Sequence, residues 1–330
     1  MATMHAIVQR AYGEGDVFAW QEVERPQPKP GQVLVRVAAA GVNSGDWHLT
    51  TGRPYLMRVM GFGLTRPKAT IPGLDAVGTV EALGEGVTDF AVGDAVFGVT
   101  EGGSGAWADF AVVNSNALMK KPASIDDVTM AASIDSAITA REAVEDVAAV
   151  RAGQTVLVIG ASGGVGSFAV QFARAAGADV TGVARAAKAD FALSLGATHV
   201  IDYRTSEITE GDRRYDVILD MAGNRPLSLL RKALAPKGTL VIVGGEEGGV
   251  VFGGIDRQLR ALMTSPFVDG RLTAHFSAGR TVKEFGKLID RLEKGDVVAR
   301  VDRTLPIARA GEALAVLRGG EVRGKVVLTA

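Results

Sequence analysis

The 330-residue sequence contains no cysteine. This absence excludes disulfides, thiolate nucleophiles and every zinc or iron–sulfur site that uses cysteine ligands. It is compatible with a reducing compartment but does not prove one. Any chemistry of this chain must therefore come from other side chains, from the backbone or from a bound cofactor.

The sequence also lacks an excess of charge of either sign and any long hydrophobic run. It has 36 Lys and Arg against 37 Asp and Glu, a net charge of −1, which argues against nucleic acid as a partner. No run approaches the ~18 apolar residues of a membrane helix, and the first residues lack the apolar core of a signal peptide. We expect a protein of the cytoplasm that binds neither membrane nor nucleic acid.

Glycine is abundant, with 42 residues against an average usage of roughly 7%. At roughly 100–200 residues per domain, the length predicts two domains, each large enough to bury its own core. The positions of the glycines therefore become the first question about function.

Up to about residue 121, short alternating runs are separated by Gly and Pro turns, which predicts an all-β, partly closed barrel. The clearest strands are Gln32–Ala38, Gly78–Leu83, Asp94–Val99 and Ala108–Val113. The segment Arg53–Lys68 is apolar and basic, and we expect a loop or short helix near the surface.

From residue 126 onward, apolar strands alternate with amphipathic helices, the pattern of a parallel sheet with right-handed crossovers. A helix is expected over Asp127–Val150. Six strands follow, as a dinucleotide-binding fold requires, at Thr155–Ile159, Asp179–Val183, His199–Asp202, Asp216–Asp220, Thr239–Val243 and Arg271–Ser277.

The last part of the chain predicts a helix over Thr281–Lys294, another over Ala308–Leu317 and a terminal strand over Gly324–Leu328. These elements most economically return to the first domain, which makes that domain discontinuous. Gly248–Phe267 is unusually hydrophobic for a connecting region, so it predicts a cover over a cleft or a contact between subunits.

The most informative motif is the run TVLVIGASGGVGSFA, residues 155–169, in which an apolar strand leads through a glycine-rich turn into a helix. Gly163 would let the backbone approach a pyrophosphate, and Gly166 would permit close helix–strand packing. The phosphates would lie on free N–H groups where the helix begins near Val165. The whole turn, Gly160, Ser162, Gly163, Gly164, Val165 and Gly166, therefore predicts dinucleotide binding, although a glycine-rich turn without a ligand is the alternative.

The end of the second strand indicates which dinucleotide binds. NAD-binding sites place a carboxylate there, but here Val183-Ala184-Arg185 is followed by Lys188, with no acid before Asp190. Arg185 and Lys188 are suited to pair with a 2′-phosphate, so the local chemistry favours NADP. The alternative is that both are ordinary solvated cations at the start of a helix.

In order along the chain, these motifs resemble the medium-chain dehydrogenase/reductase superfamily, specifically its zinc-independent, zeta-crystallin-like quinone oxidoreductase branch. The resemblance is carried by Gly41-Val42-Asn43 with Asp46, Pro72-Gly73-Leu74-Asp75 with Gly78-Thr79-Val80, Val92-Gly93-Asp94, Ile138-Thr139-Ala140, the glycine turn, Leu195-Gly196-Ala197, Val200-Ile201-Asp202-Tyr203 and Gly324-Lys325-Val326-Val327-Leu328.

The resemblance implies an α/β chain made of two domains. A GroES-like, β-rich catalytic domain would comprise residues 1–124 and 280–330. A Rossmann domain with a doubly wound, six-stranded parallel sheet would comprise residues 125–279 and bind NADP. Family members usually form homodimers or homotetramers through the sixth strand, here Arg271–Ser277.

Zinc-dependent members carry a cysteine and a Gly-His-Glu motif at their metal site, where this sequence has Asn43 and Gly73-Leu74-Asp75. The resemblance therefore implies no catalytic metal, so zinc is not available to polarise a carbonyl. What remains is hydride transfer from NADPH to an acceptor that is already electrophilic. A quinone or an α,β-unsaturated carbonyl meets that requirement.

The resemblance also assigns contacts to individual residues. Lys188 and Tyr203 would line the 2′-phosphate, Thr139 would lie near the nicotinamide, and Asn43 and Asp46 would face the acceptor. From their places at strand ends, Asn224, Gly244 and Gly245 would lie at the ligand-facing edge of the sheet.

The roles of the candidate catalytic residues stay open at this point. Asn43 would position a substrate oxygen, or it would cap a turn. Asp46 would act in the cleft, or it would only make local hydrogen bonds. Tyr55 would stack on a flat acceptor, or it would fill core space.

The sequence thus predicts a zinc-free NADPH-dependent reductase of quinones or enones that acts on a small-molecule hydride acceptor. Two alternatives remain: an NAD(P)-dependent carbonyl reductase or alcohol dehydrogenase, and a regulatory protein that binds NADPH with little catalysis. Fold-level resemblance alone does not select the acceptor.

Overall fold

The computed structural model describes residues 2–245, 249–275 and 281–330. By its internal contacts the chain divides into two compact units. The first comprises residues 1–135, 279–295 and 299–330, and the second comprises residues 136–278 and 296–298. The predicted domain limits, with residues 1–124 and 280–330 in one domain and residues 125–279 in the other, stay a prediction.

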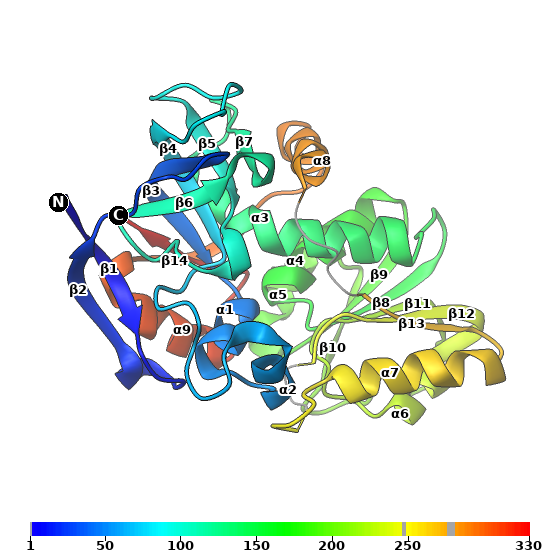
Figure 1. Cartoon of the computed structure of the whole chain (residues 1–330). Helices are drawn as coiled ribbons and strands as arrows, with labels where there is room; N and C mark the ends of the chain where they lie inside the picture. Colours follow the sequence, from blue (N-terminus) through cyan, green and yellow to red (C-terminus); the bar gives the residue numbers. More distant parts are fainter. Residues whose placement is uncertain (1, 246–248, 276–280) are drawn as a thin grey trace. The chain divides into compact units, whose positions relative to one another are not determined.

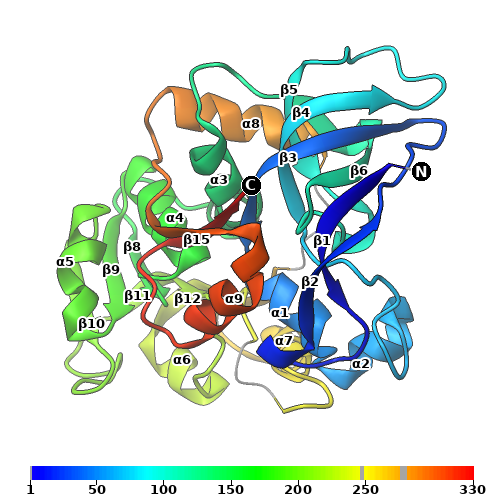
Figure 2. The same cartoon turned by 90° about the vertical axis from the view of Figure 1, so that its left-hand side faces the viewer.

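The first unit is built on an antiparallel sheet in the order β14-β15-β3-β4-β5-β7, with β6 also paired to β3. A separate antiparallel pair, β1-β2, forms a sheet of its own (Figure 2), and Met4, Ala6 and Val8 of β1 pack with Leu34 of β3. The strands are β1 Thr3–Gln9, β2 Phe18–Glu24, β3 Gln32–Val42, β4 Asp75–Leu83, β5 Ala95–Val99, β6 Phe110–Asn114, β7 Leu118–Lys120, β14 Val301–Pro306 and β15 Lys325–Thr329.

The helices that lie wholly in the first unit have at most 12 residues. They are α1 Ser44–Thr51, α2 Tyr55–Met57 with a π-helical turn at Arg58–Phe62, α8 Val282–Glu293 and α9 Ala310–Arg318. The core gathers around Trp107, which is fully buried together with side chains from β3, β15 and α9. Each aliphatic side chain buried in this way contributes about 1.5–3 kcal/mol to stability.

Six parallel strands form the second unit, in the order β10-β9-β8-β11-β12-β13. This is the strand order of a doubly wound dinucleotide-binding sheet, so the predicted α/β fold class is confirmed. The strands are β8 Thr155–Ile159, β9 Asp179–Ala184, β10 His199–Asp202, β11 Tyr215–Asp220, β12 Leu234–Ile242 and β13 Arg271–Ala274.

Helices cover both faces of this sheet, with α4 on one side and α6 and α7 on the other (Figure 1). They are α4 Gly164–Ala175, α5 Ala189–Ser194, α6 Leu227–Ala233 and α7 Ile255–Thr264. Helix α3, Asp127–Arg141, begins in the first unit and ends in the second, followed by a π-helical turn at Glu142–Val147. No helix among the described residues is both long enough and apolar enough to span a membrane.

Two expectations need correction. Gly248–Phe267 is not simply a connecting region, because Ile255–Thr264 forms α7. Its glycine-rich start hid a helix whose Gln258 and Ala261 are buried while other apolar side chains face outward. The predicted strand Arg271–Ser277 ends at Ala274 in the structure, and residues 276 and 277 lie outside the described residues.

Candidate active site

The glycine-rich turn joins β8 to α4 at the carboxyl edge of the parallel sheet. Gly160 has φ +82°, a left-handed conformation that favours glycine. Its N–H and that of Ala161 both donate to the Val183 carbonyl at 3.1 Å, which fixes the turn against β9. Helix α4 begins at Gly164, and the N–H groups of its first turn have no acceptor within their own helix.

The two motif glycines serve different purposes. A Cβ at Gly166 would lie 2.0 Å from the Gly160 carbonyl oxygen, so only glycine allows this helix–strand approach. A Cβ at Gly163 would meet only the Gly160 oxygen, at an ordinary 3.5 Å, and its φ of −83° suits any residue. The fold itself does not require glycine at 163, and its predicted contact with a pyrophosphate stays a prediction.

The predicted phosphate-side residues come together at the ends of β9 and β10. Arg185 Nε donates to the Tyr203 hydroxyl at 2.8 Å, although 18 residues separate them. Lys188 is 7% exposed and lies in the short turn that follows Arg185. Two cations and a phenol thus occupy the strand end where an NAD site would have a carboxylate.

The loops after β11 and β12 are held in close contact by glycine. A Cβ at Gly244 would lie 1.9 Å from the Met221 carbonyl oxygen, and one at Gly245 would lie 2.6 Å from Gly254 Cα. Internal packing alone therefore requires glycine at 244 and 245. Asn224 is exposed in the loop after β11, and Thr139 is half-buried on the last turn of α3.

Asp220 organises this edge, a role that was not predicted from the sequence, where it appeared only as the end of a strand. It is fully buried at the end of β11, accepts from the Gly223 N–H at 3.0 Å, and pairs with Arg257 of α7. Arg257 Nε also donates to the Arg225 carbonyl at 2.8 Å. The signal available in the sequence was a carboxylate directly after the apolar run Val217–Leu219.

In the first unit, Asn43 lies between β3 and α1 within a buried polar cluster formed by Asn43, Asp46, Asp75 and Lys325. Asn43 is 3% exposed. Its Nδ2 donates to Asp75 Oδ2 at 2.9 Å, and its Oδ1 accepts from Lys325 Nζ at 2.5 Å. An ammonium only donates and a carboxylate only accepts, so these partners fix the orientation of the amide and leave one Nδ2–H for another acceptor.

The carboxylate of Asp46 accepts its hydrogen bonds from backbone N–H groups. Its two oxygens accept from the N–H groups of Asn43 at 2.8 Å and Leu74 at 3.0 Å. These bonds fix the start of α1 against the segment that precedes β4. We therefore assign Asp46 to positioning Asn43, and direct action on an acceptor stays a prediction.

Burial dominates the electrostatics of the cluster. It raises the pKa of Asp46 well above the ordinary range, and the neighbouring Asp75 raises the pKa further. Burial also raises the pKa of Asp75, while the Lys325 ammonium opposes that shift. The pKa of Lys325 is lowered by burial, and Asp75 opposes this change. The ammonium thus compensates carboxylates that would otherwise be buried without a cation.

Lys325 appeared in the sequence only as part of a terminal motif, so its place in the cluster was missed. It opens β15, whose next residue, Val326, pairs with Val42 of β3, and its Nζ also donates to the Val42 carbonyl at 3.0 Å. The available signal was a lysine at the start of a strand that is otherwise apolar.

Tyr55 lies on α2, outside the hydrogen bonds of the cluster, and is 41% exposed. The Arg58 guanidinium lies 4.5 Å from the centre of its ring and 4.2 Å from that of Tyr12. Its predicted stacking on an acceptor stays a prediction. No group of three or more His, Asp and Glu side chains in the described parts of the chain is arranged to hold a metal ion.

Two family models match the chain. One is described as an alcohol dehydrogenase GroES-like domain and matches residues 29–123, and the other is described as a zinc-binding dehydrogenase and matches residues 195–328. The first model confirms the predicted GroES-like domain. The second model's name refers to zinc, whereas this chain has neither the cysteine nor the Gly-His-Glu motif expected of a zinc-dependent member.

Relatives and solved structures agree with these models. Quinone oxidoreductase of Sus scrofa is 35% identical over 249 residues, 73% of each chain. The 2-haloacrylate reductase of a Burkholderia species is 34% identical over 254 residues, 74% of each chain. A mycobacterial protein solved in complex with NADPH has a TM-score of 0.82 and 28% identity, covering 99% of this chain and 100% of its own. The chain belongs to the medium-chain dehydrogenase/reductase superfamily, in its zinc-independent quinone oxidoreductase branch, and is an oxidoreductase of that type.

Proposed function

We propose that this protein is an NADPH-dependent reductase that transfers a hydride to a quinone or an α,β-unsaturated carbonyl without a metal ion. The observation that carries the proposal is the fixed amide of Asn43, a buried hydrogen-bond donor where zinc-dependent members carry a metal ligand. The names of the two relatives, a quinone oxidoreductase and a 2-haloacrylate reductase, support the same class of acceptor.

The glycine turn would hold the pyrophosphate, through the space at Gly163 and the first N–H groups of α4. Arg185, Lys188 and Tyr203 would bind the 2′-phosphate, because a guanidinium matches a phosphate and a carboxylate is missing from the end of β9. Thr139, Asn224, Gly244 and Gly245 remain proposed contacts of the nicotinamide side.

When bound, NADPH supplies a hydride to the electrophilic carbon, and the π-electron pair of the acceptor moves to its oxygen. Asn43 would donate its remaining Nδ2–H to that oxygen as negative charge develops there. Lys325 would polarise the amide by donating to its Oδ1. Asp75 would prevent the side-chain amide from flipping by 180°, because it accepts from Nδ2. The proton that completes the product comes from solvent.

We include assembly into a homodimer or homotetramer in the proposal. Support comes from α7 and the turn after it, where Met263 is 73% exposed and Phe267 is 86% exposed. Exposed apolar groups of this size are typical of contact surfaces. A cytoplasmic location stays a prediction.

Steady-state kinetics tests the reaction. The protein is given NADPH or NADH with a benzoquinone, an enone or a simple aldehyde, with and without a chelator. We expect turnover of the quinone and the enone with NADPH, little turnover of the aldehyde, and no effect of the chelator. Loss of turnover on chelation contradicts the metal-free mechanism, and preferred aldehyde reduction identifies a carbonyl reductase. Stabilisation by NADPH without turnover of any acceptor identifies a binding protein.

The cofactor assignment has a narrower test. Arg185→Glu places a like charge beside the 2′-phosphate, so we expect kcat/KM for NADPH to fall at least tenfold while that for NADH changes little. Arg231→Ala, a surface cation on α6, serves as the control and should change neither value. Equal losses for NADH and NADPH would show that Arg185 does not contact the phosphate.

A further inference from the structure

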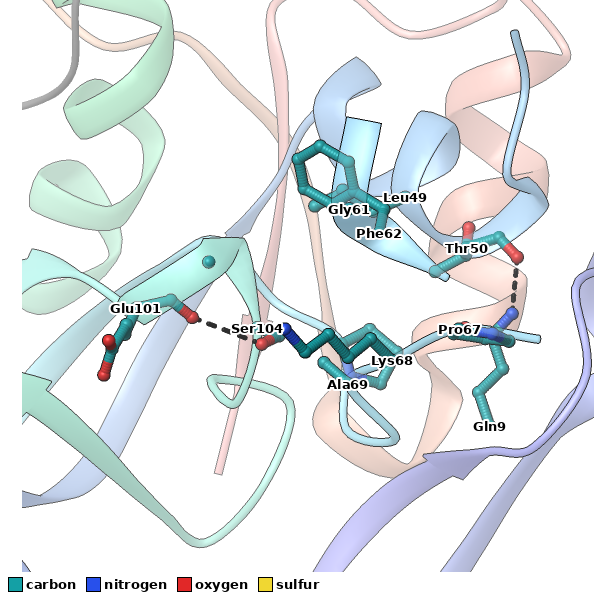
Figure 3. A pocket seen from close by; sticks show the side chains of 12 residues that line it. Gln9, Leu49, Thr50, Gly61, Phe62, Pro67, Lys68, Ala69, Glu101 and Ser104 are labelled. Carbon is teal, nitrogen blue, oxygen red and sulfur yellow. Dashed lines mark hydrogen bonds between the residues drawn. The ribbon is translucent and has the colours of Figure 1, made fainter. Parts of the chain in front are cut away.

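A second feature of the first unit is a cavity of about 380 Å³ (Figure 3). Its volume lies within the range of ordinary small-molecule sites. Apolar walls come from Leu49, Phe62, Pro67 and Pro72, and the polar groups at its edge include Lys68 and Ser104. The cavity thus combines a surface for a carbon skeleton with a charged group.

The cavity shares two elements with the buried polar cluster. Leu49 and Thr50 lie on the last turn of α1, and that helix begins directly after Asn43. Pro72 lies on the segment that continues through Leu74, which is hydrogen-bonded to Asp46, into Asp75. The same pieces of backbone that hold the amide of Asn43 therefore also form a wall of the cavity.

The segment 53–74, which contributes Phe62, Lys68 and Pro72 to the cavity, has charged side chains of positive sign only. Residues 53–74 include Arg53, Arg58, Arg66 and Lys68 and no Asp or Glu. Lys68 extends into the cavity toward Ser104, and within the described residues it has no ion-pair partner. The carboxylate of Glu101, at the opposite edge, points away from Lys68 in Figure 3 and accepts from Gln32 Nε2 at 3.3 Å.

We propose that this cavity receives the body of the acceptor and that Lys68 selects acceptors with an acidic substituent remote from the reacting carbonyl. The ligand class is a quinone or enone that also carries a carboxylate. The carboxylate would pair with the Lys68 ammonium in the cavity, and the reacting carbonyl would extend along α1 toward Asn43, which does not itself line the cavity. This inference rests on the proposed function, because it names the acceptor class of the same site.

Ion pairing at an open cavity makes a modest contribution, so the expected effect is selectivity rather than all-or-none activity. It should act on KM, because the acidic group takes no part in hydride transfer and is bound equally in the ground and transition states. It should also weaken as ionic strength rises, since salt screens exposed charges.

The experiment compares 3-(3,6-dioxocyclohexa-1,4-dien-1-yl)propanoate with its methyl ester, an acid and a neutral quinone of the same skeleton in which two methylene groups separate the acidic group from the reacting ring. For Lys68→Gln we expect kcat/KM for the acid to fall about threefold to fivefold through KM, with the ester changed less than twofold. Arg66→Gln removes the same charge two residues away, outside the residues that line the cavity, and should leave both acceptors within twofold. In the wild type, the acid-to-ester ratio should fall with added salt.

Three results overturn the proposal: equal loss for acid and ester in Lys68→Gln, no loss for either, or the same loss of acid reduction in Arg66→Gln. In each case continued reduction of the ester or of benzoquinone leaves the proposed function standing. If the wild type reduces none of these acceptors, the proposed function itself fails, and the selectivity inference fails with it.

Discussion

At the scale of single residues, the main finding is that Asn43 is oriented by its partners. Lys325 and Asp75 contact opposite ends of the same amide, so its donor and acceptor sides are not interchangeable. Asp46 contributes by fixing the backbone on either side of the cluster. A single amide thereby becomes a rigid donor through charged groups that need not touch the acceptor.

Replacement of Lys325 tests this orientation. Lys325→Met leaves Asp75 without its cation, and breaking a buried charge pair typically costs about 3–5 kcal/mol of stability. In the protein that still folds, we expect kcat for benzoquinone to fall at least tenfold while KM for NADPH stays within twofold, because the cofactor site lies on other residues. Thermal unfolding and steady-state kinetics on the same sample measure both effects.

Lys325→Gln is the matched control, since it keeps a neutral donor near Asn43 Oδ1, and it should recover part of the lost kcat. Removal of the cation should also raise the pKa of Asp75 further, because Lys325 now opposes the effect of burial. If ionised Asp75 holds the amide, the acid limb of the kcat profile moves to higher pH in Lys325→Met. A loss of stability with kcat and pH profile unchanged would mean that Lys325 is only structural.

At the scale of elements, the turn between β8 and α4 separates glycine required by the fold from glycine available to a ligand. Gly166 faces a backbone oxygen that leaves no room for a methyl group, whereas a methyl group at Gly163 would meet only the Gly160 oxygen at an ordinary contact distance. In this motif, packing therefore requires glycine at 166, whereas glycine at 163 is explained by the proposed binding of a pyrophosphate.

A pair of alanine substitutions distinguishes the two requirements. Gly166→Ala should destabilise the protein by about 2–3 kcal/mol, because the Cβ would overlap the Gly160 carbonyl and α4 must move. Gly163→Ala should change stability by less than about 1 kcal/mol yet weaken NADPH binding at least tenfold, since its methyl group would occupy the space of the pyrophosphate. Chemical denaturation and fluorescence titration give the two quantities. Unchanged NADPH affinity in Gly163→Ala would place the pyrophosphate elsewhere.

The sequence predicted local elements well where burial is regular. Thr155–Ile159 has the predicted limits because it is buried in the parallel sheet and is apolar along almost its whole length. His199–Asp202 also has the predicted limits, although it is an edge strand whose side chains are exposed or half-buried. Strand β2 was missed because most of its side chains are exposed or half-buried, and β14 resembles it in this respect. The terminal strand was predicted one residue early, at Gly324–Leu328 instead of Lys325–Thr329.

The site was predictable only where it is local. The glycine turn is continuous in sequence, so its geometry follows from strand, turn and helix alone. The partner of Asn43 was not predictable, because Lys325 reaches it only through the pairing of β15 with β3. Asp220 was missed for a similar reason, since its partner Arg257 lies on a helix that the sequence did not reveal.

At the scale of the whole molecule, the chain has two units, each with a hydrophobic core of its own. The core of the second unit collects buried residues from β8, β11 and β12, all from within that unit. The proposed cofactor contacts also belong to the second unit, whereas the acceptor cavity belongs to the first. NADPH should therefore stabilise the two units unequally.

Calorimetry with the intact chain tests this inequality. With NADPH at 100 times its Kd, binding stabilises the unit that holds it by about 2.7 kcal/mol. We expect two thermal transitions, of which one rises by roughly 5–10 °C with NADPH while the other moves much less. A single transition, or two that rise equally, would show that the units unfold together.

The pairing of β15 with β3 also has a consequence for the order of synthesis. Lys325 and Asn43 are 282 positions apart, and the whole second unit is made between them. At roughly 5–20 residues per second, a ribosome would need about 15–60 s to add the lysine after the asparagine. During that interval Asp46 and Asp75 have no lysine to compensate their charge. The second unit has all its strands by then, so the unit proposed to bind the cofactor should mature in a nascent chain before the unit proposed to receive the acceptor.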